Sequence, residues 1–188
     1  MEAVGYDLYC KMLNEAVQKL KGLDGTDNSD MDSFATLIDL DVDAFIPPTY
    51  IVNEMQKLDI YKRIAGIENE KERDDMCDEL LDRFGEIPQS VDNLLRIALI
   101  RVAAHKLFLT EVKGKNERIV FTFKPDAKVN PAGIPKLLER VGRDLTFTAY
   151  GTPALTYKYR KSGLLEKDAE LLLGRTQEIL TLMSELLR

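Results

Sequence analysis

Several residue types that build catalytic and metal sites are scarce in this chain of 188 residues. It contains no Trp, a single histidine (His105) and only two cysteines, Cys10 and Cys77. One histidine excludes metal sites and proton relays that need two of them, and the cysteines are too far apart to form a CxxC pair. We therefore expect free thiols in a reducing, cytoplasmic environment, and Cys77 to be a core residue rather than a nucleophile.

Long apolar runs and phosphate-binding loops are also missing. Charged side chains interrupt the most apolar stretch, residues 94–109, so no membrane span is expected. The chain contains no GxxxxGK[ST] sequence, no GxGxxG after a strand and no GxSxG. These absences disfavour nucleotide hydrolysis and nucleophilic catalysis, and we predict that the chain is not an enzyme and has no catalytic residue.

One motif has the spacing of a metal site without its full ligand set. Asp39, Asp41 and Asp43 copy the first three ligands of a calcium loop, but Ala44 and Tyr50 stand where such a loop needs Gly and Glu. Alternating carboxylates on the solvent face of a strand explain the pattern better. We expect no metal and no cofactor in this chain.

What the chain does have is a core-forming composition and an uneven charge. Apolar residues make up 45% and charged residues 31%. Residues 1–95 hold 22 acidic and 9 basic side chains, whereas residues 96–188 hold 10 and 17. The basic half leaves open a domain that binds nucleic acid, although its Lys and Arg are dispersed along the chain and form no basic run. Direct nucleic-acid binding is not our first expectation.

Apolar periodicity divides the chain into three parts. Residues 1–21 form an amphipathic helix, residues 22–33 have the composition of a linker, and residues 34–188 form the main domain. In that domain the patterns predict, in order, a strand at 38–46, helices at 50–67, 69–84 and 88–107, strands at 108–112 and 118–123, a helix at 130–141, strands at 145–149 and 155–159, and a helix at 164–187. This order predicts an α+β fold: a first strand, a helical segment, then an antiparallel sheet from two strand pairs with a crossing helix and a C-terminal helix.

The predicted helix at 69–84 offers the clearest candidate for a binding surface. Asn69 is a suitable N-cap and Gly85 a suitable C-terminal stop. The pattern predicts a core face made of Cys77, Leu80, Leu81 and Phe84. The opposite face and the following turn carry the candidate partner-binding residues, which are Asp75, Glu79, Asp82, Arg83 and Glu86. Charges at an interface add specificity and encounter rate.

Several short strings, in this order, resemble the C-terminal domain of the bacterial transcription-repair coupling factors, the Mfd family. They are Phe45-Ile46-Pro47, Tyr61 to Ala65, Asp82-Arg83-Phe84-Gly85 with Pro88, and Asn130-Pro131. The opening, from Val4 to Val17, resembles the end of the translocase motor that precedes this domain in the family.

The resemblance implies a non-catalytic, autoinhibitory domain in DNA repair. In the family, the C-terminal domain docks on a UvrB-like N-terminal module of the same protein and masks the surface that binds UvrA. The full protein would use ATP and Mg²⁺ in an upstream motor to translocate on DNA and displace stalled RNA polymerase. A nucleic-acid-binding accessory domain, a small enzyme and a structural appendage of the motor remain the alternatives.

Overall fold

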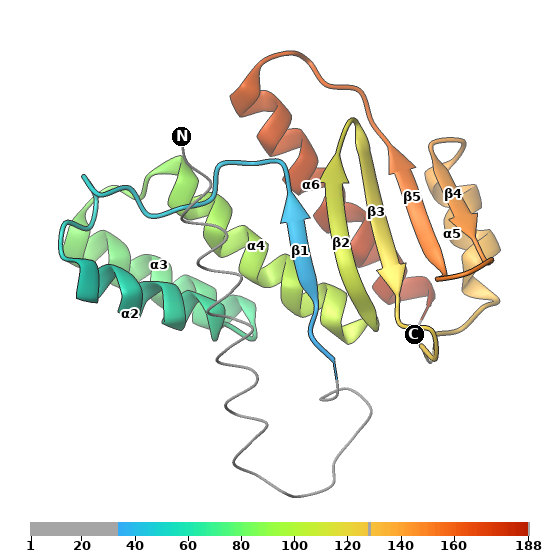
Figure 1. The fold of residues 1–188 in the computed structure, drawn as a ribbon, viewed down its shortest axis with the longest axis horizontal. Coiled ribbons are helices and arrows are strands. Elements are labelled where there is room, and N and C mark those ends of the chain that lie inside the picture. The colour runs from blue at the N-terminus through green and yellow to red at the C-terminus, as the bar shows by residue number, and fades with distance from the viewer. Residues whose placement is uncertain (1–33, 128, 188) are drawn as a thin grey trace, which may run out of the picture. The chain divides into compact units, whose positions relative to one another are not determined.

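The computed structural model describes residues 34–127 and 129–187, and these form two compact units. The helical unit is Asp43–Val102, and the sheet unit consists of residues 34–42 and 103–187. The helix predicted at 1–21 and the linker predicted at 22–33 lie outside the described residues. Within the main domain the α+β class is confirmed, with five helices and a five-stranded sheet among the described residues (Figure 1).

The helical unit contains α2 (Glu54–Ala65), α3 (Glu70–Phe84) and most of α4 (Gln89–Lys106), whose last turn belongs to the sheet unit. The first helix begins four residues later than predicted, because the Asn53 side chain caps it by accepting from the backbone N–H groups of Met55 and Gln56, both at 3.0 Å. Asn69 caps α3 as predicted, accepting from the Glu72 N–H at 3.0 Å.

The three helices share an aliphatic core. At most 1% of Ile60, Ile64, Leu80 and Leu94 is exposed. The Arg101 guanidinium on α4 donates to the carbonyls of Ala65 (2.9 Å) and Ile67 (3.1 Å), which lie at and just beyond the end of α2. These charge-assisted hydrogen bonds stabilise the C-terminal end of α2 in addition to its apolar packing.

The sheet unit is built on a mixed sheet with strand order β1-β2-β3-β5-β4. The strands are β1 (Leu37–Leu40), β2 (Leu109–Lys115), β3 (Arg118–Phe123), β4 (Leu145–Thr148) and β5 (Ala154–Lys158). Only the β1–β2 pair is parallel; the other pairs are antiparallel. The antiparallel part agrees with the predicted strand pairs, and β1 extends it at one edge.

Two helices cover one face of this sheet, α5 (Gly133–Val141) and the long α6 (Leu165–Leu186) (Figure 1). The strand residues that face them are buried, as the alternating pattern of β3 shows: Ile119, Phe121 and Phe123 are at most 2% exposed. The residues between them lie on the opposite face of the sheet.

In the β2–β3 hairpin, the first strand is longer than predicted, and packing explains the difference. The strands were predicted to end at residue 112 and to begin again at 118, but β2 continues to Lys115 and the turn is made by Asn116 and Glu117, with φ of 53° and 58°. Gly114 is a packing glycine instead. A Cβ there would lie 2.7 Å from a methyl of Leu40 and 2.8 Å from one of Leu172 on α6.

The start of α5 was also predicted too early. The helix was predicted at 130–141, but α5 begins at Gly133. The Asn130 side chain does accept from the backbone N–H of Ala132, at 3.1 Å, so it stabilises the turn that leads into the helix. At Gly133 the backbone lies close against the end of α6, since a Cβ would lie 1.9 Å from the Leu186 carbonyl oxygen.

Candidate docking surface on the helical unit

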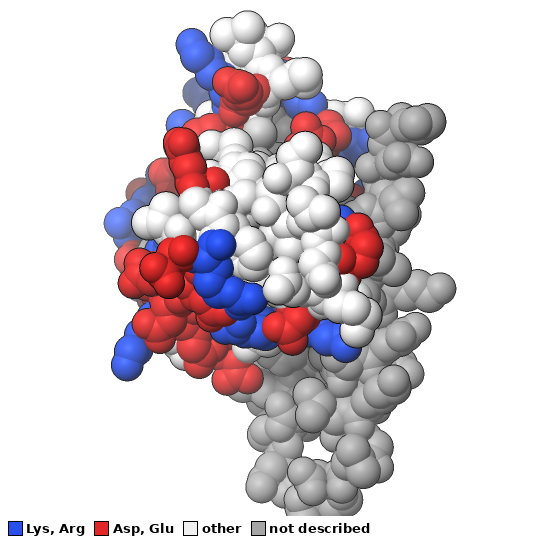
Figure 2. Space-filling model, turned by 90° about the vertical axis from the view of Figure 1, so that its left-hand side faces the viewer, with Lys and Arg blue, Asp and Glu red and all other residues white. Residues whose placement is uncertain are grey.

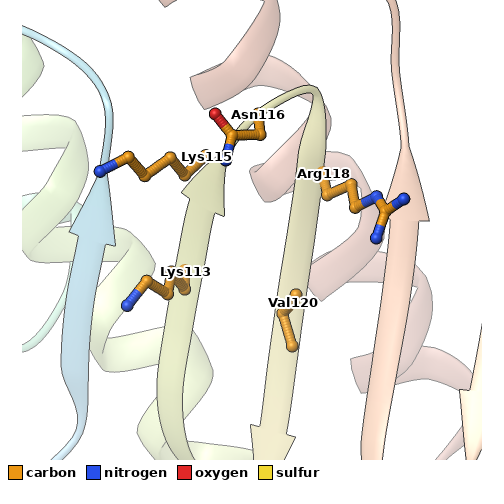
Figure 3. Close-up of a pocket in the computed structure, with 5 residues that line it drawn as sticks. All are labelled: Lys113, Lys115, Asn116, Arg118 and Val120. Carbon is orange, nitrogen blue, oxygen red and sulfur yellow. The ribbon is translucent and has the colours of Figure 1, made fainter.

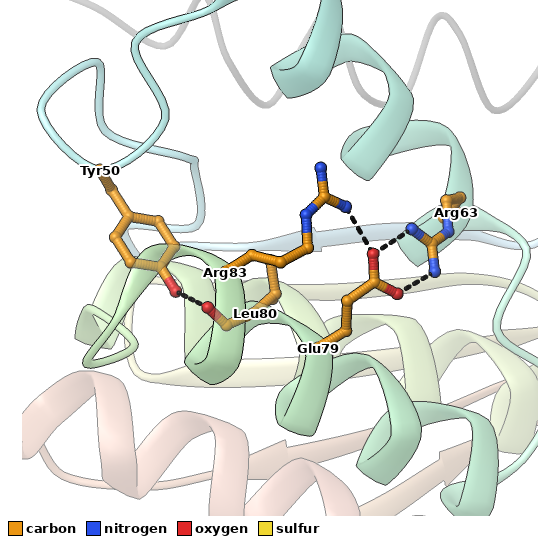
Figure 4. A network of polar contacts seen from close by, with 5 residues as sticks. All are labelled: Tyr50, Arg63, Glu79, Leu80 and Arg83. Carbon is orange, nitrogen blue, oxygen red and sulfur yellow. Dashed lines mark hydrogen bonds and ion pairs between the residues drawn. The ribbon is translucent and has the colours of Figure 1, made fainter.

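An ion-pair network joins α2 to α3 on the outside of the helical unit (Figure 4). The Glu79 carboxylate accepts from both terminal nitrogens of Arg63, with the Nη1–Oε1 contact at 2.7 Å. The same carboxylate accepts from Arg83, one turn along α3, at 2.6 Å. Glu79 therefore links two helices and holds two guanidinium groups side by side, a fork geometry that favours carboxylate partners.

The electrostatics of Glu79 follow from these contacts. The hydrogen bonds from Arg63, and then from Arg83, lower the pKa of the Glu79 carboxyl from 4.5 to about 2. Each guanidinium has five N–H donors, and Glu79 uses only some of them, so both Arg63 and Arg83 keep donors directed toward solvent. Within the chain, the Glu79 carboxylate positions these arginines, while its predicted role in binding a partner stays a prediction.

Tyr50 holds the loop before α2 against the end of α3 (Figure 4). Its hydroxyl lies 3.2 Å from the carbonyl oxygens of Leu80 and Gly85, to which it donates, and burial raises the pKa of this phenol. Its ring contacts that of Phe84 with centroids 5.8 Å apart, and the Arg83 guanidinium lies 4.9 Å from the centroid of the Phe84 ring. The loop and the helix end thus form one continuous surface.

Large apolar side chains lie exposed on this unit. The exposed fraction is 79% for Val52, 75% for Met55 and 56% for Leu81. Figure 2 shows a face on which uncharged residues form a broad area, bordered on one side by closely spaced acidic and basic side chains. Soluble proteins seldom leave several large apolar side chains exposed beside charged ones without a partner, so we treat the part of the helical unit that carries Val52, Met55 and Leu81 as the candidate docking surface.

The exposure of Leu81 corrects the predicted core of α3. The side chains that this helix buries are Met76 and Leu80, while Cys77 and Phe84 are only half-buried. A buried face centred on Met76 and Leu80 leaves Leu81 about 100° around the helix from Leu80. The apolar pattern therefore correctly predicted that α3 is amphipathic, but it predicted the wrong side of the helix as the core face.

The remaining predicted site residues lie exposed on or beside the same helix. Asp75, Asp82 and Glu86 are exposed, and among the described residues none of them forms an ion pair or hydrogen bond through its side chain. Asp82 and Glu86 lie beyond Glu79 toward the end of α3, whereas Asp75 is one turn before it. The structure thus brings together Glu79 and Arg83, and leaves the other three carboxylates available to a partner.

Four contributors to this surface were missed from the sequence: Tyr50, Val52, Met55 and Arg63. Arg63 lies 16 residues before Glu79, so no helical periodicity relates the two, and only the packing of α2 on α3 does. Val52 and Met55 fit the apolar pattern of a helix that was expected to begin at residue 50. The Asn53 cap was the signal that could have placed Val52 outside that helix.

The described residues hold neither a cluster of metal-ligating side chains nor a helix suited to span a membrane. Among them no group of three or more His, Cys, Asp or Glu side chains is arranged to hold a metal ion. In the same part of the chain, no helix has the length and hydropathy needed to cross a membrane.

Comparisons with known proteins agree on one family. The sequence model of the family described as "TRCF domain" matches residues 40–134. The chain is 35% identical over 139 residues to a protein of Bacillus subtilis (strain 168), and 34% identical over 140 residues to one of Escherichia coli (strain K12), each named transcription-repair-coupling factor. Each match covers 74% of this chain but only 11% and 12% of the respective relative.

A solved structure extends this agreement to the fold. The crystal structure of a C-terminal domain of transcription-repair coupling factor superposes with a TM-score of 0.64 at 26% identity, covering 81% of this chain and 96% of that one. The fold, and not only the sequence, is therefore shared with a domain that has been isolated and solved by itself.

Proposed function

This chain belongs to the TRCF domain family, and from that premise we propose that it is a regulatory docking domain which binds a UvrB-like N-terminal module of its own protein and masks the surface that binds UvrA. The TRCF domain itself is not the ATPase motor. Translocation on DNA driven by ATP, and the displacement of RNA polymerase, would belong to the rest of the protein. The matched part of this chain covers only 12% of the Escherichia coli relative.

The observation that carries the proposal is the pairing of exposed apolar side chains with available carboxylates on one unit. Val52, Met55 and Leu81 would supply the apolar centre of an interface. Asp82 and Glu86 would receive basic groups of the partner, and the guanidinium groups of Arg63 and Arg83 would receive its carboxylates. The module should therefore present an apolar area with basic residues beside it.

A clasp of this kind must also open. A surface with a few apolar anchors and a charged rim suits a contact of modest size better than a large, dry, permanent interface. Shifting a closed state to an open one requires a differential affinity of only a few kcal/mol, which a second partner can supply. The proposed surface is consistent with such a switch.

Calorimetric titration of the 188-residue chain with the separately expressed module would test the contact. We expect binding that weakens as salt is raised, and at least tenfold weaker binding when Asp82 and Glu86 are both replaced by Arg. Replacing Glu139 and Glu166 by Arg changes the net charge equally at exposed positions of the sheet unit, and should leave the affinity within twofold.

A second measurement separates a weak contact from an absent one. Tethering raises the effective concentration of the two partners, so a contact too weak to detect between separate molecules can still form within the intact protein. If deleting residues 34–188 from the full-length protein does not increase its affinity for UvrA, the masking role is wrong.

A further inference from the structure

The open face of the sheet unit carries a row of cations that the fold assembles from three strands. Lys115 on β2 lies opposite Arg118 on β3, and Arg118 lies opposite Lys158 on β5. All three are exposed, whereas their neighbours Gly114 and Ile119 are buried on the helix-covered face. Because adjacent strands lie about 4.8 Å apart, the row spans roughly 10 Å. We refer to Lys115, Arg118 and Lys158 as the cationic row.

The side chains of this region point over the open face of the sheet (Figure 3). Lys113 and Lys115 extend from β2 toward β1, while Arg118 extends from β3 toward β5. Together with Asn116 and Val120 they line a shallow hollow of about 490 Å³. The polar side chain of Asn116 at the turn adds a donor and an acceptor at one end of this hollow.

The ion pairs in this part of the sheet unit are formed by neighbours of the cationic row. Lys113 pairs with Asp39 at 3.5 Å, and Lys161 pairs with Asp41 at 3.1 Å. Glu117, in the turn between Lys115 and Arg118, accepts from the backbone N–H of Lys161 at 2.8 Å. Within the described residues, the cationic row has no ion pair of its own. Like charges on neighbouring strands are unfavourable, so an anionic polymer that lies over this part of the sheet would relieve a local repulsion.

The chemistry of the hollow favours a phosphate backbone over a protein partner. Among the described residues that line it, Val120 alone is apolar, and it is half-buried, so this lining lacks the apolar centre that protein interfaces have. Protein–DNA interfaces are more polar and more positively charged. The lining residues that the structure describes include no aromatic side chain, so they offer no platform on which the bases of a single strand could stack.

We infer that the cationic row and Asn116 bind the phosphodiester backbone of duplex DNA without reading its sequence. Lys and Arg supply the charge, and the planar guanidinium of Arg118 suits two oxygens of one phosphate. The contact covers about three phosphates and is weak by itself. It lies on the sheet unit and does not depend on the docking surface proposed for the helical unit.

Fluorescence anisotropy with a labelled duplex of 20 base pairs and mixed sequence tests the inference on the 188-residue chain. Three phosphate contacts predict a slope of about −3 for log K against log salt, so affinity should fall about 100-fold between 20 and 100 mM salt. Replacing both Lys115 and Arg118 by Ser should weaken binding at least tenfold at 20 mM salt and reduce the slope by about 2.

A matched variant, Lys136→Ser with Arg143→Ser, removes the same charge from exposed positions outside the row and should bind within twofold of the unaltered chain. Circular dichroism confirms that both variants are folded. Equal losses in the two variants would mean that net charge, not this site, attracts DNA. The inference is also overturned if the unaltered chain fails to bind at 20 mM salt, or if it binds a single strand or a polyglutamate peptide more tightly than the duplex.

Discussion

The two units differ in which surface groups they satisfy internally: the helical unit pairs charges and leaves apolar side chains exposed, whereas the sheet unit covers an apolar face and leaves cations unpaired among the described residues. In the helical unit, Glu79 is neutralised from within by Arg63 and Arg83, while Val52, Met55 and Leu81 are left exposed. In the sheet unit, the buried face of the sheet is covered by α5 and α6, while the cationic row is left without internal counter-charges among the described residues. Surfaces that folding leaves unsatisfied indicate where partners can bind, and here the two surfaces favour different chemistries.

The largest contrast is expected between two neighbouring leucines of α3. Leu80→Ala should destabilise the chain by about 2–5 kcal/mol, since Leu80 is fully buried and its removal leaves a cavity. Leu81→Ala should stay within about 0.5 kcal/mol, because Leu81 is 56% exposed. Urea unfolding of the two variants measures both values. Similar losses would show that Leu81 is part of the core, and would remove it from the docking surface.

Replacing either of two helical glycines of the sheet unit by Ala should change the stability of the chain, in opposite directions. Gly133→Ala should cost about 3 kcal/mol, because the added Cβ meets the backbone carbonyl of Leu186, which cannot move aside as a side chain can. Gly174→Ala, in α6, has nothing within 4 Å of the added atom and should stabilise by about 1 kcal/mol through helix propensity. Thermal unfolding reports both signs, and a stabilised Gly133→Ala variant would contradict the close approach of α5 to α6.

A smaller effect is expected for the ion-pair network of the helical unit. Glu79→Gln should cost about 1 kcal/mol at neutral pH, because both pairs are partly exposed. The pKa of Glu79 is lower in the folded than in the unfolded chain, so its contribution is present above pH 4.5 and is lost as the pH falls toward 2. Urea unfolding at pH 6 and pH 3 should show the gap between the two proteins narrowing. A gap that widened in acid would contradict the internal role of Glu79.

The smallest effect is expected where the sheet unit has its unpaired charges. Lys115→Ser and Arg118→Ser should each change the free energy of unfolding by less than about 0.5 kcal/mol, since both side chains are exposed. Chemical denaturation of the single variants checks this. A clear loss of stability would mean that the cationic row supports the fold. Weaker DNA binding by these variants would then be explained by loss of folded protein rather than by loss of a binding site.

Local signals in the sequence were sufficient for much of the fold. Asn69 and Gly85 marked the ends of α3, and Gly85 has the positive φ of 83° that makes a glycine useful there. Alternation of apolar residues located the strands of the sheet unit. These predictions succeeded because a cap or a strand face depends on residues only a few positions apart.

Predictions failed where one local signal had two physical explanations. Gly114 lies between the strands predicted at 108–112 and 118–123, where a glycine is also typical of a turn, and the structure uses it for contact between β2 and α6. The apolar string in α3 did not reveal which side is buried, because Met76 and Leu81 are both compatible with a helix that buries Leu80. Choosing between them required the position of the neighbouring helices.

By itself, the sequence determined the α+β class, the order of the elements, the family and the amphipathic character of α3, because short-range periodicity and short motifs encode all of these. Only the tertiary structure decided that Arg63 would neutralise Glu79 and that Leu81 would be exposed. It also gathered Lys115, Arg118 and Lys158, from three strands, into one row. Such neighbours depend on strand register and helix packing, which are set by burial across the whole unit rather than by adjacent residues.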